Sequence, residues 1–278
     1  MVKKSIAVIL TVHNRKMKTL ECLSSLFKEH NNFEVFLTND GCTDGTSEAI
    51  AMTFPQVHLI EGDGTLFWNR GMYKAFETAS KMDFEFYLWL NDDTVFVSDF
   101  IQKLLDCSSS EMNKAIICGA TVDNKNTEQV TYGGYTKSVK SLPLSSQKQQ
   151  CYFASGNILL IPRYVFKKVG LNDFKFRHAL GDFDYEGRAN KLGIKVVQAP
   201  NYLGYCERHS SIPKWRDDNY SIIERIHHLY SPTGRNPYEF IYFDKRHNGV
   251  FKAIVHYFTL HLRCFFPHLF CFNYTEKE

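Results

Sequence analysis

The sequence predicts an α/β fold, with an open, mostly parallel sheet that has helices on both faces and a helical C-terminal appendage. Strand-like apolar runs alternate with segments of helical periodicity, which is typical of right-handed βαβ units. The continuous β-branched run at 5–12 favours a strand buried on both faces of a parallel sheet. From about residue 210 onward the pattern is helical, which predicts the appendage.

The individual elements follow from local patterns. Met17, Leu20, Leu23 and Phe27 recur at helical spacing and predict the first helix. The predicted strands cover 5–12, 33–38, 57–60, 84–90, 115–122, 152–161 and 194–198. The predicted helices cover 16–28, 46–53, 69–80, a segment that begins near Ser98, a short segment that begins at Pro162, and 182–192, which Gly193 ends.

Residues 123–150 interrupt the alternation. This stretch is polar and rich in Ser, Gln, Lys and Gly, so it lacks the apolar residues of a packed core. It predicts an insertion or mobile loop, with a hairpin around Gly133 and Gly134. Because the strand pattern stops near residue 210, we expect two domains, 1–210 and 211–278.

Composition limits the class of protein. The chain has 278 residues and a net charge of +3, which argues against a nucleic-acid partner. None of its eight cysteines forms a CxxC pair, so we expect buried thiols in a reducing compartment. No signal-peptide pattern and no apolar run of membrane-spanning length is visible. We therefore expect a cytoplasmic protein, and peripheral contact with the inner face of the cell membrane stays open.

The loops after the first two strands differ from nucleotide-binding loops built on glycine. Residues 5–15, which end in Thr11-Val12-His13-Asn14-Arg15, contain no glycine, which argues against dinucleotide-binding and P-loop motifs. The second loop, 39–45, places Asp40 at the carboxyl end of a strand, where ligands bind in open α/β sheets. Asp40 there is suited to accept hydrogen bonds from a base or ribose. Ordinary turn chemistry, with Asp44 or Thr46 capping the next helix, is the alternative.

Two later loops add carboxylates. Asn91-Asp92-Asp93 ends an apolar strand, and adjacent carboxylates there favour a hard divalent cation over a helix cap near Ser98. Asp182 lies at the start of a predicted helix, as a cap or as a general base in a cleft. Asp184 and Arg188 are spaced as a surface ion pair.

Taken together, residues 5–210 resemble the family 2 glycosyltransferases, of the inverting GT-A type with a nucleotide-diphospho-sugar transferase fold. The first loop looks like the family's opening, and 39–45 looks like its acidic second loop. Asn91-Asp92-Asp93 stands where the DxD motif falls, and Gly181-Asp182 stands where the acidic base motif falls. The segments 62–72 and 182–188 resemble a rhamnosyltransferase-like branch.

The resemblance implies transfer of a hexosyl or deoxyhexosyl group from a UDP- or dTDP-linked donor to a saccharide or lipid-linked acceptor, in bacterial surface polysaccharide synthesis. It implies Mg²⁺ or Mn²⁺ on Asp93, and Asp182 as the base. Two positions depart from the motifs, because Asn91 replaces an Asp and Gly181 replaces an acid, so that Asp182 must act alone. The expected donor-binding residues are Thr11, His13, Arg15, Asp40, Trp68, Asn69, Arg70, Asn91 and Asp92.

Some of these roles have structural alternatives. Trp68, Asn69 and Arg70 fit a donor pocket, in which Arg70 suits phosphate oxygens, or the start of a helix with a buried Trp. His209 is expected as a second metal ligand or diphosphate contact, and a structural role is the alternative.

Other functions and partners also stay open. A sugar nucleotidyltransferase usually has the Gly-rich first loop that is absent here, and a non-catalytic nucleotide-sugar-binding module would not need Asp93 and Asp182. Residues 245–275 are basic and aromatic without any Asp or Glu, which suits an anionic membrane surface. A packing helix or a homodimer contact is the alternative there.

Overall fold

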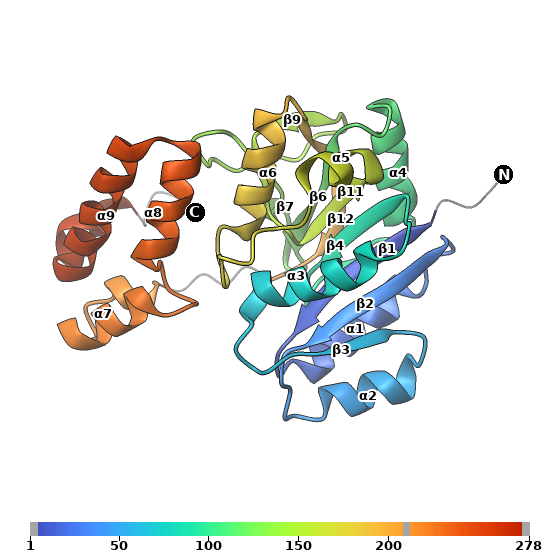
Figure 1. Cartoon of the computed structure of the whole chain (residues 1–278), viewed down its shortest axis with the longest axis horizontal. Helices are drawn as coiled ribbons and strands as arrows, with labels where there is room; N and C mark the ends of the chain where they lie inside the picture. Colours follow the sequence, from blue (N-terminus) through green and yellow to red (C-terminus); the bar gives the residue numbers. More distant parts are fainter. Residues whose placement is uncertain (1–4, 208–211, 274–278) are drawn as a thin grey trace. The chain divides into compact units, whose positions relative to one another are not determined.

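A computed structural model describes residues 5–207 and 212–273 (Figure 1). Contacts group these residues into two compact units. The sheet unit holds 5–174 and 181–207, and the helical unit holds 175–180 and 212–273. The short segment 175–180, which no sequence pattern separates from its neighbours, thus belongs with the C-terminal helices.

The sheet unit is built on one large mixed sheet whose main strands share a direction. β1 lies between β2 and β4 and is parallel to both, and β6 is parallel to β12. The antiparallel strand β11 joins the two parts. In spatial order the strands are β3 (His58–Glu61), β2 (Phe33–Asn39), β1 (Ile6–Val12), β4 (Phe86–Leu90), β11 (Ile158–Pro162), β6 (Ile116–Asp123), β12 (Val196–Tyr205) and β5 (Val95–Phe96), with β7 (Asn126–Tyr132) on β6 and β9 (Gln149–Cys151) on β12. A small separate sheet pairs β8 (Gly134–Tyr135) with β10 (Phe153–Ala154).

Both faces of the sheet are buried, as the β-branched runs predicted. Along β1, Val8 and Leu10 pack in one core, whereas Ala7 and Ile9 pack in another. The first core is covered by α1 (Lys16–Leu26), α2 (Thr46–Thr53) and α4 (Phe100–Ser110), and the second by α3 (Phe67–Ser80), α5 (Arg163–Val169) and α6 (Gly181–Lys191). The predicted α/β class with helices on both faces is therefore confirmed.

The register of the sheet explains why the acidic loops meet. Val12 of β1 pairs with Asn39 of β2, and β4 runs parallel to β1 on its other side. The first, second and fourth strands therefore release their loops at the same edge.

The polar stretch 123–150 is more regular than expected. Residues 126–132 form β7, antiparallel to β6, so the hairpin turn lies at 124–125 and its prediction at Gly133 and Gly134 was wrong. Gly133 instead allows close packing, because a Cβ there would lie 2.9 Å from Gln198 Oε1. β12 also continues well beyond the predicted 194–198.

The helical unit confirms the predicted α-helical appendage. Its elements are η1 (Lys214–Arg216), α7 (Ile222–Tyr230), α8 (Pro237–His247), α9 (Val250–Phe265) and η2 (Pro267–Asn273). A capping box of Ser221 and Glu224 starts α7. A small core of Trp215, Leu229 and Phe240 with Leu260 and Cys264 of α9 holds these helices together. In the described part of the chain, no helix has both the length and the apolarity needed to cross a membrane.

Candidate active site

Arg15 joins the first loop to the acidic loop after β4. Its Nη1 atom lies 3.1 Å from Asp92 Oδ1, and its Nη2 atom lies 2.5 Å from Asp93 Oδ2. Arg15 directly precedes α1, and both carboxylates follow the end of β4, so neighbouring parallel strands deliver the three groups. A cation therefore already bridges the two adjacent acids, which relieves their mutual repulsion.

The two carboxylates of this loop differ in their surroundings. Burial raises the pKa of Asp92 to about 6, against the opposing effect of Arg15, and Thr19 Oγ1 donates to it at 3.4 Å. Asp93 Oδ1 lies 3.6 Å from the Sγ atom of Cys206. Because burial raises the pKa of this thiol to about 12, Cys206 stays protonated and acts as a weak donor.

Trp68 links the acidic loop to the start of α6. Its Nε1 atom donates to Asn91 Oδ1 at 2.8 Å. Its ring lies over Gly156, where an added Cβ would come within 2.5 Å of Trp68 Cζ2. The amide of Gly156 in turn donates to Asp182 Oδ2 at 3.1 Å. Contacts therefore connect Asn91, the first residue of the Asn91-Asp92-Asp93 triplet, to Asp182, the predicted base.

Asp182 is a carboxylate in a desolvated position. It is the second residue of α6 and accepts a second hydrogen bond from the amide of Phe183 at 2.9 Å. Burial raises the pKa of Asp182 to about 6, and the two amide donors only partly offset that effect. A carboxyl with such a pKa is ionised at neutral pH but remains a stronger base than an exposed aspartate.

The Asp40 carboxylate is occupied by the backbone of a neighbouring loop. Its Oδ1 atom accepts from the amides of Gly64 at 2.9 Å and Leu66 at 3.3 Å, and its Oδ2 atom accepts from Phe67 at 3.0 Å. Phe67 has a φ of 58°, an unfavourable backbone conformation for this side chain. Asp40 therefore holds the loop that leads into Trp68. His13 Nδ1 adds a 2.5 Å hydrogen bond to the Asp40 carbonyl.

Asn69 explains the glycine at the base motif. It is fully buried, donates to the Asp173 carbonyl at 2.8 Å, and accepts from Asn172 Nδ2 at 2.7 Å. A Cβ at Gly181 would lie 1.8 Å from Asn69 Oδ1, so no larger residue fits while Asn69 keeps this position. The acid common in the family at position 181 is thus excluded by a side chain of α3.

Two further predicted donor residues have structural contacts. The Nε atom of Arg70 donates to the Phe174 carbonyl at 2.9 Å, and its guanidinium lies 4.7 Å from the centre of the Phe174 ring. Thr11 is buried, donates to the Thr38 carbonyl at 3.3 Å, and packs against Gly71. Both side chains are therefore held in contacts within the protein.

The predicted residues therefore fall into groups. Arg15, Asn91, Asp92 and Asp93 lie at one sheet edge, and Trp68 connects them to Asp182. The other predicted donor-binding residues hydrogen-bond to the protein's own backbone. They are Thr11, His13, Asp40, Asn69 and Arg70. His209 lies outside the described residues. Gly156, Asn172 and Cys206 were not predicted, because no local sequence pattern indicates a contact with a distant segment.

The acidic loop suits a divalent cation whose remaining ligands come from a bound substrate. Within residues 5–207 and 212–273, no group of three or more His, Cys, Asp and Glu side chains could hold a metal ion. Mg²⁺ and similar cations are commonly held by one or two carboxylates together with substrate phosphates. Asp92 and Asp93 fit that arrangement, since both already contact the cationic group of Arg15.

Comparison with known proteins identifies the family. A sequence profile described as Glycosyl transferase family 2 matches residues 7–170, more than half of the chain. The chain belongs to glycosyl transferase family 2. An uncharacterized glycosyltransferase of Rickettsia typhi is 27% identical over 190 residues, covering 64% of this chain and 56% of that protein. A second one, of Rickettsia prowazekii, is 26% identical with the same coverage. This family 2 chain thus spans little more than half the length of these curated relatives.

Solved structures show the same fold. A mannosyltransferase from Pyrobaculum calidifontis, in complex with GDP-Man and Mn²⁺, has a TM-score of 0.56 at 17% identity and covers 93% of this chain and 70% of that one. GalNAc-T7 with UDP, GalNAc and Mn²⁺ has a TM-score of 0.57 at 14% identity, over 88% and 50% of the two chains. The predicted GT-A fold of this family 2 protein is confirmed. The rhamnosyltransferase-like branch is not singled out and stays a prediction.

Proposed function

We propose that this family 2 protein is an inverting glycosyltransferase, which moves a sugar from a nucleoside diphosphate sugar to a saccharide or lipid-linked acceptor. One observation supports it above the others. A half-buried carboxylate, Asp182, is connected through Gly156 and Trp68 to the paired acids after β4. A base and an acidic loop suited to a metal-bound diphosphate are the two groups that such a transfer requires.

Asp182 is the proposed general base. Its pKa of about 6 leaves it ionised at neutral pH, ready to take the proton of an acceptor hydroxyl. The hydroxyl oxygen forms a bond to the anomeric carbon while the bond from that carbon to the diphosphate oxygen breaks. Attack from the face opposite the leaving group inverts the configuration.

The acidic loop is the proposed diphosphate side of the site. A divalent metal, Mg²⁺ or Mn²⁺, held by Asp93 with Asp92 beside it, would neutralise charge on the leaving group. Arg15 is positioned to share the carboxylates or to contact phosphate oxygens, for which a guanidinium is well suited. The GDP-Man, UDP and Mn²⁺ of the two solved neighbours support a nucleotide-sugar donor with a metal.

The finer assignments extend this proposal. The likeness of segments 62–72 and 182–188 to a rhamnosyltransferase-like branch supports a dTDP-linked deoxyhexosyl donor, with a UDP-linked hexosyl donor as the alternative. The resemblance to the family as a whole supports a role in bacterial surface polysaccharide synthesis. We propose that the protein works in the cytoplasm, where nucleotide sugars are available. The free thiols of the described cysteines are consistent with that reducing compartment.

Donor turnover tests the proposal against its alternatives. The purified chain is incubated with UDP-, GDP- and dTDP-sugars, with Mn²⁺ or with EDTA, and the released products are identified. Metal-dependent release of a nucleoside diphosphate, lost in Asp182→Asn, is expected. Pyrophosphate as the product would indicate a nucleotidyltransferase. Binding of a donor without any turnover, with or without added acceptor saccharides, would indicate a binding module and overturn the proposal.

A further inference from the structure

Helix α9 has two apolar faces, of which only one is used by the helical unit. Ala253, Leu260 and Cys264 are buried against the neighbouring helices. The opposite face exposes large apolar side chains, including Phe251 at 82% and Phe258 at 61% of their surface. A helix with large apolar side chains on two faces is normally covered on both of them. The exposed large apolar residues here are Val250, Phe251, Ile254, Val255, Phe258, Leu262, Phe266 and Leu269.

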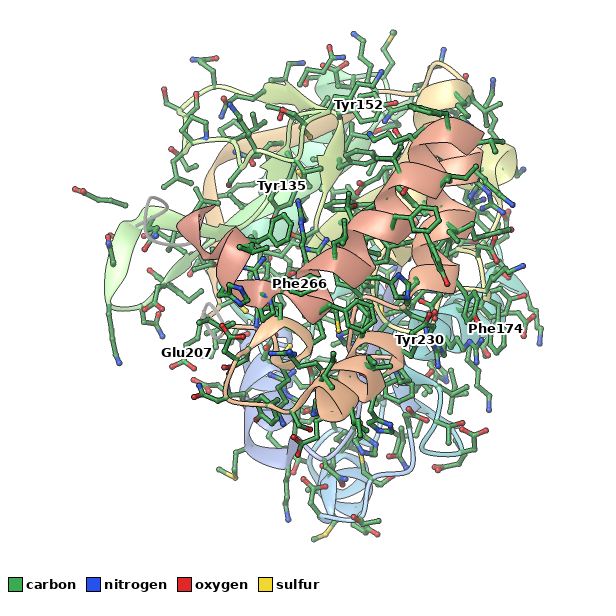
Figure 2. The ribbon with its side chains drawn as sticks, turned by 90° about the vertical axis from the view of Figure 1, so that its left-hand side faces the viewer. Tyr135, Tyr152, Phe174, Glu207, Tyr230 and Phe266 are labelled. Atoms are coloured by element: carbon green, nitrogen blue, oxygen red, sulfur yellow. The ribbon has the colours of Figure 1, made fainter. Side chains whose placement is uncertain are left out.

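The residues that lie on α9 form one stripe and are not scattered single exposures. Positions 251, 254, 255, 258 and 262 repeat at the three- and four-residue spacing that places them on one side of a helix. Phe266, which is labelled in Figure 2, and Leu269 follow directly after α9. We call the eight exposed residues the α9 stripe. A contiguous apolar surface of this kind marks an interaction site more often than single exposed residues do.

The two charged side chains of α9 itself, Lys252 and Arg263, are both positive. At 100° per residue, Lys252 and Arg263 fall on the same edge of the stripe, and eleven residues separate them by about three turns, or about 16 Å. Residues 245–275 contain no Asp or Glu. The preceding acid, Asp244, is buried and bonded to His256 at 2.6 Å. Within 245–275 the stripe is therefore bordered by basic side chains and by no acidic one, and the neighbouring Asp218 is paired with Arg225 at 3.0 Å.

We propose that the α9 stripe lies in the surface of an anionic lipid bilayer, with Lys252 and Arg263 at the headgroups. A long apolar stripe with basic residues along its border suits helices that lie in the membrane interface. An antiparallel contact between two copies of the stripe would bring the two basic edges together, which disfavours that homodimer, whereas an anionic bilayer is complementary to the basic edge. The proposal does not depend on the chemistry of the sheet unit.

Vesicle binding tests the proposal on the full chain. The protein is sedimented with phosphatidylcholine vesicles that contain or lack phosphatidylglycerol, and the bound fraction is measured at low and raised salt. We expect clear binding only to the anionic vesicles, weakened by salt. Phe251→Ser with Phe258→Ser should lower the partition coefficient about tenfold or more, because each exposed ring contributes to insertion. Lys252→Glu with Arg263→Glu should abolish the preference for phosphatidylglycerol.

The matched control changes exposed apolar residues elsewhere. Met17 and Met52 of the sheet unit are exposed at 75% and 85%, and Met17→Ser with Met52→Ser should leave vesicle binding unchanged. Circular dichroism and thermal unfolding show whether each variant is folded. Equal sedimentation of the wild type and the folded Phe251/Phe258 variant would overturn the proposal. A second result would also overturn the proposal. In it, the wild-type protein does not bind the vesicles, and light scattering shows a dimer that the Phe251 and Phe258 changes dissociate.

Discussion

Trp68 donates its indole N–H to Asn91 at 2.8 Å, so the side chain in the first position of the acidic triplet is held by helix α3. An aspartate at position 91 would accept the same bond but would add a third negative charge beside Asp92 and Asp93. Asn91 therefore keeps the hydrogen bond while limiting repulsion within the loop.

Trp68→Phe should weaken donor binding. Phenylalanine preserves most of the ring but leaves Asn91 Oδ1 without its donor, at a cost of about 1 kcal/mol, so we expect KM for the donor to rise about fivefold to tenfold. Steady-state kinetics measure it. In a double-mutant cycle, Asn91→Ala should remove most of the effect of Trp68→Phe. Additive effects of the two changes would contradict the coupling.

Asp182→Asn should remove turnover and leave donor binding intact. An amide cannot take the acceptor proton, so kcat should fall about 10³-fold with little change in the Kd of the donor. Wild-type kcat should rise with pH through about 6, since the raised pKa of Asp182 keeps the base protonated and inactive below that value. Rates measured between pH 5 and 8 check this. A flat profile, or normal transfer by Asp182→Asn, would exclude Asp182 as the base.

Gly181→Ala should destabilise the fold even though the change is a single methyl group. The new Cβ would lie 1.8 Å from Asn69 Oδ1, so Asn69 or α6 must move, which we expect to cost about 2 kcal/mol. Urea denaturation measures the loss. Gly193→Ala is a useful contrast, because its added Cβ meets no atom within 4 Å and only its φ of 73° opposes it. In the Asn69→Ala background, Gly181→Ala should cost less, because the contact with Oδ1 is removed and only the one with the Cβ of residue 69, at 2.9 Å, remains.

Asp93→Ala should remove metal-dependent donor binding. Loss of this carboxylate leaves Asp92, which is buried and also bonded to Thr19, whereas Asp93 is not among the buried residues. In thermal-shift measurements with UDP, the added stabilisation by Mn²⁺ should disappear. Asp63→Ala, which changes an exposed acid bonded to Thr65, is the control and should keep the Mn²⁺ effect. An unchanged Mn²⁺ effect in Asp93→Ala would place the metal elsewhere.

Much of the architecture could be predicted because the local spacing of apolar residues determines where the strands and helices form. The run at 5–12 is apolar on both faces and became the buried strand β1, and the strand order then placed the loops that end in Arg15 and Asp93 at one edge. The position of the β6–β7 turn could not be predicted in the same way. Glycines at 133 and 134 suggest a turn, but here they serve close packing against Gln198.

The site was predictable in its acids but not in how they are held. Nothing near Asp40 in the sequence indicates that its carboxylate accepts three amides from 64–67, or that Asn69 closes the space at Gly181. Both relationships join residues that lie more than twenty positions apart. A motif gives the type of a side chain, whereas its partners depend on the complete fold.

The bonds of Asp40 also bear on attempts to redesign the protein. A carboxylate that anchors three backbone amides cannot be exchanged to retune nucleotide preference without releasing the loop before Trp68, and a mutant library at this position would select mainly for folding. Engineering of donor choice is better directed at the exposed His13, which contacts the Asp40 carbonyl and Asn14 but anchors no backbone amide of another loop.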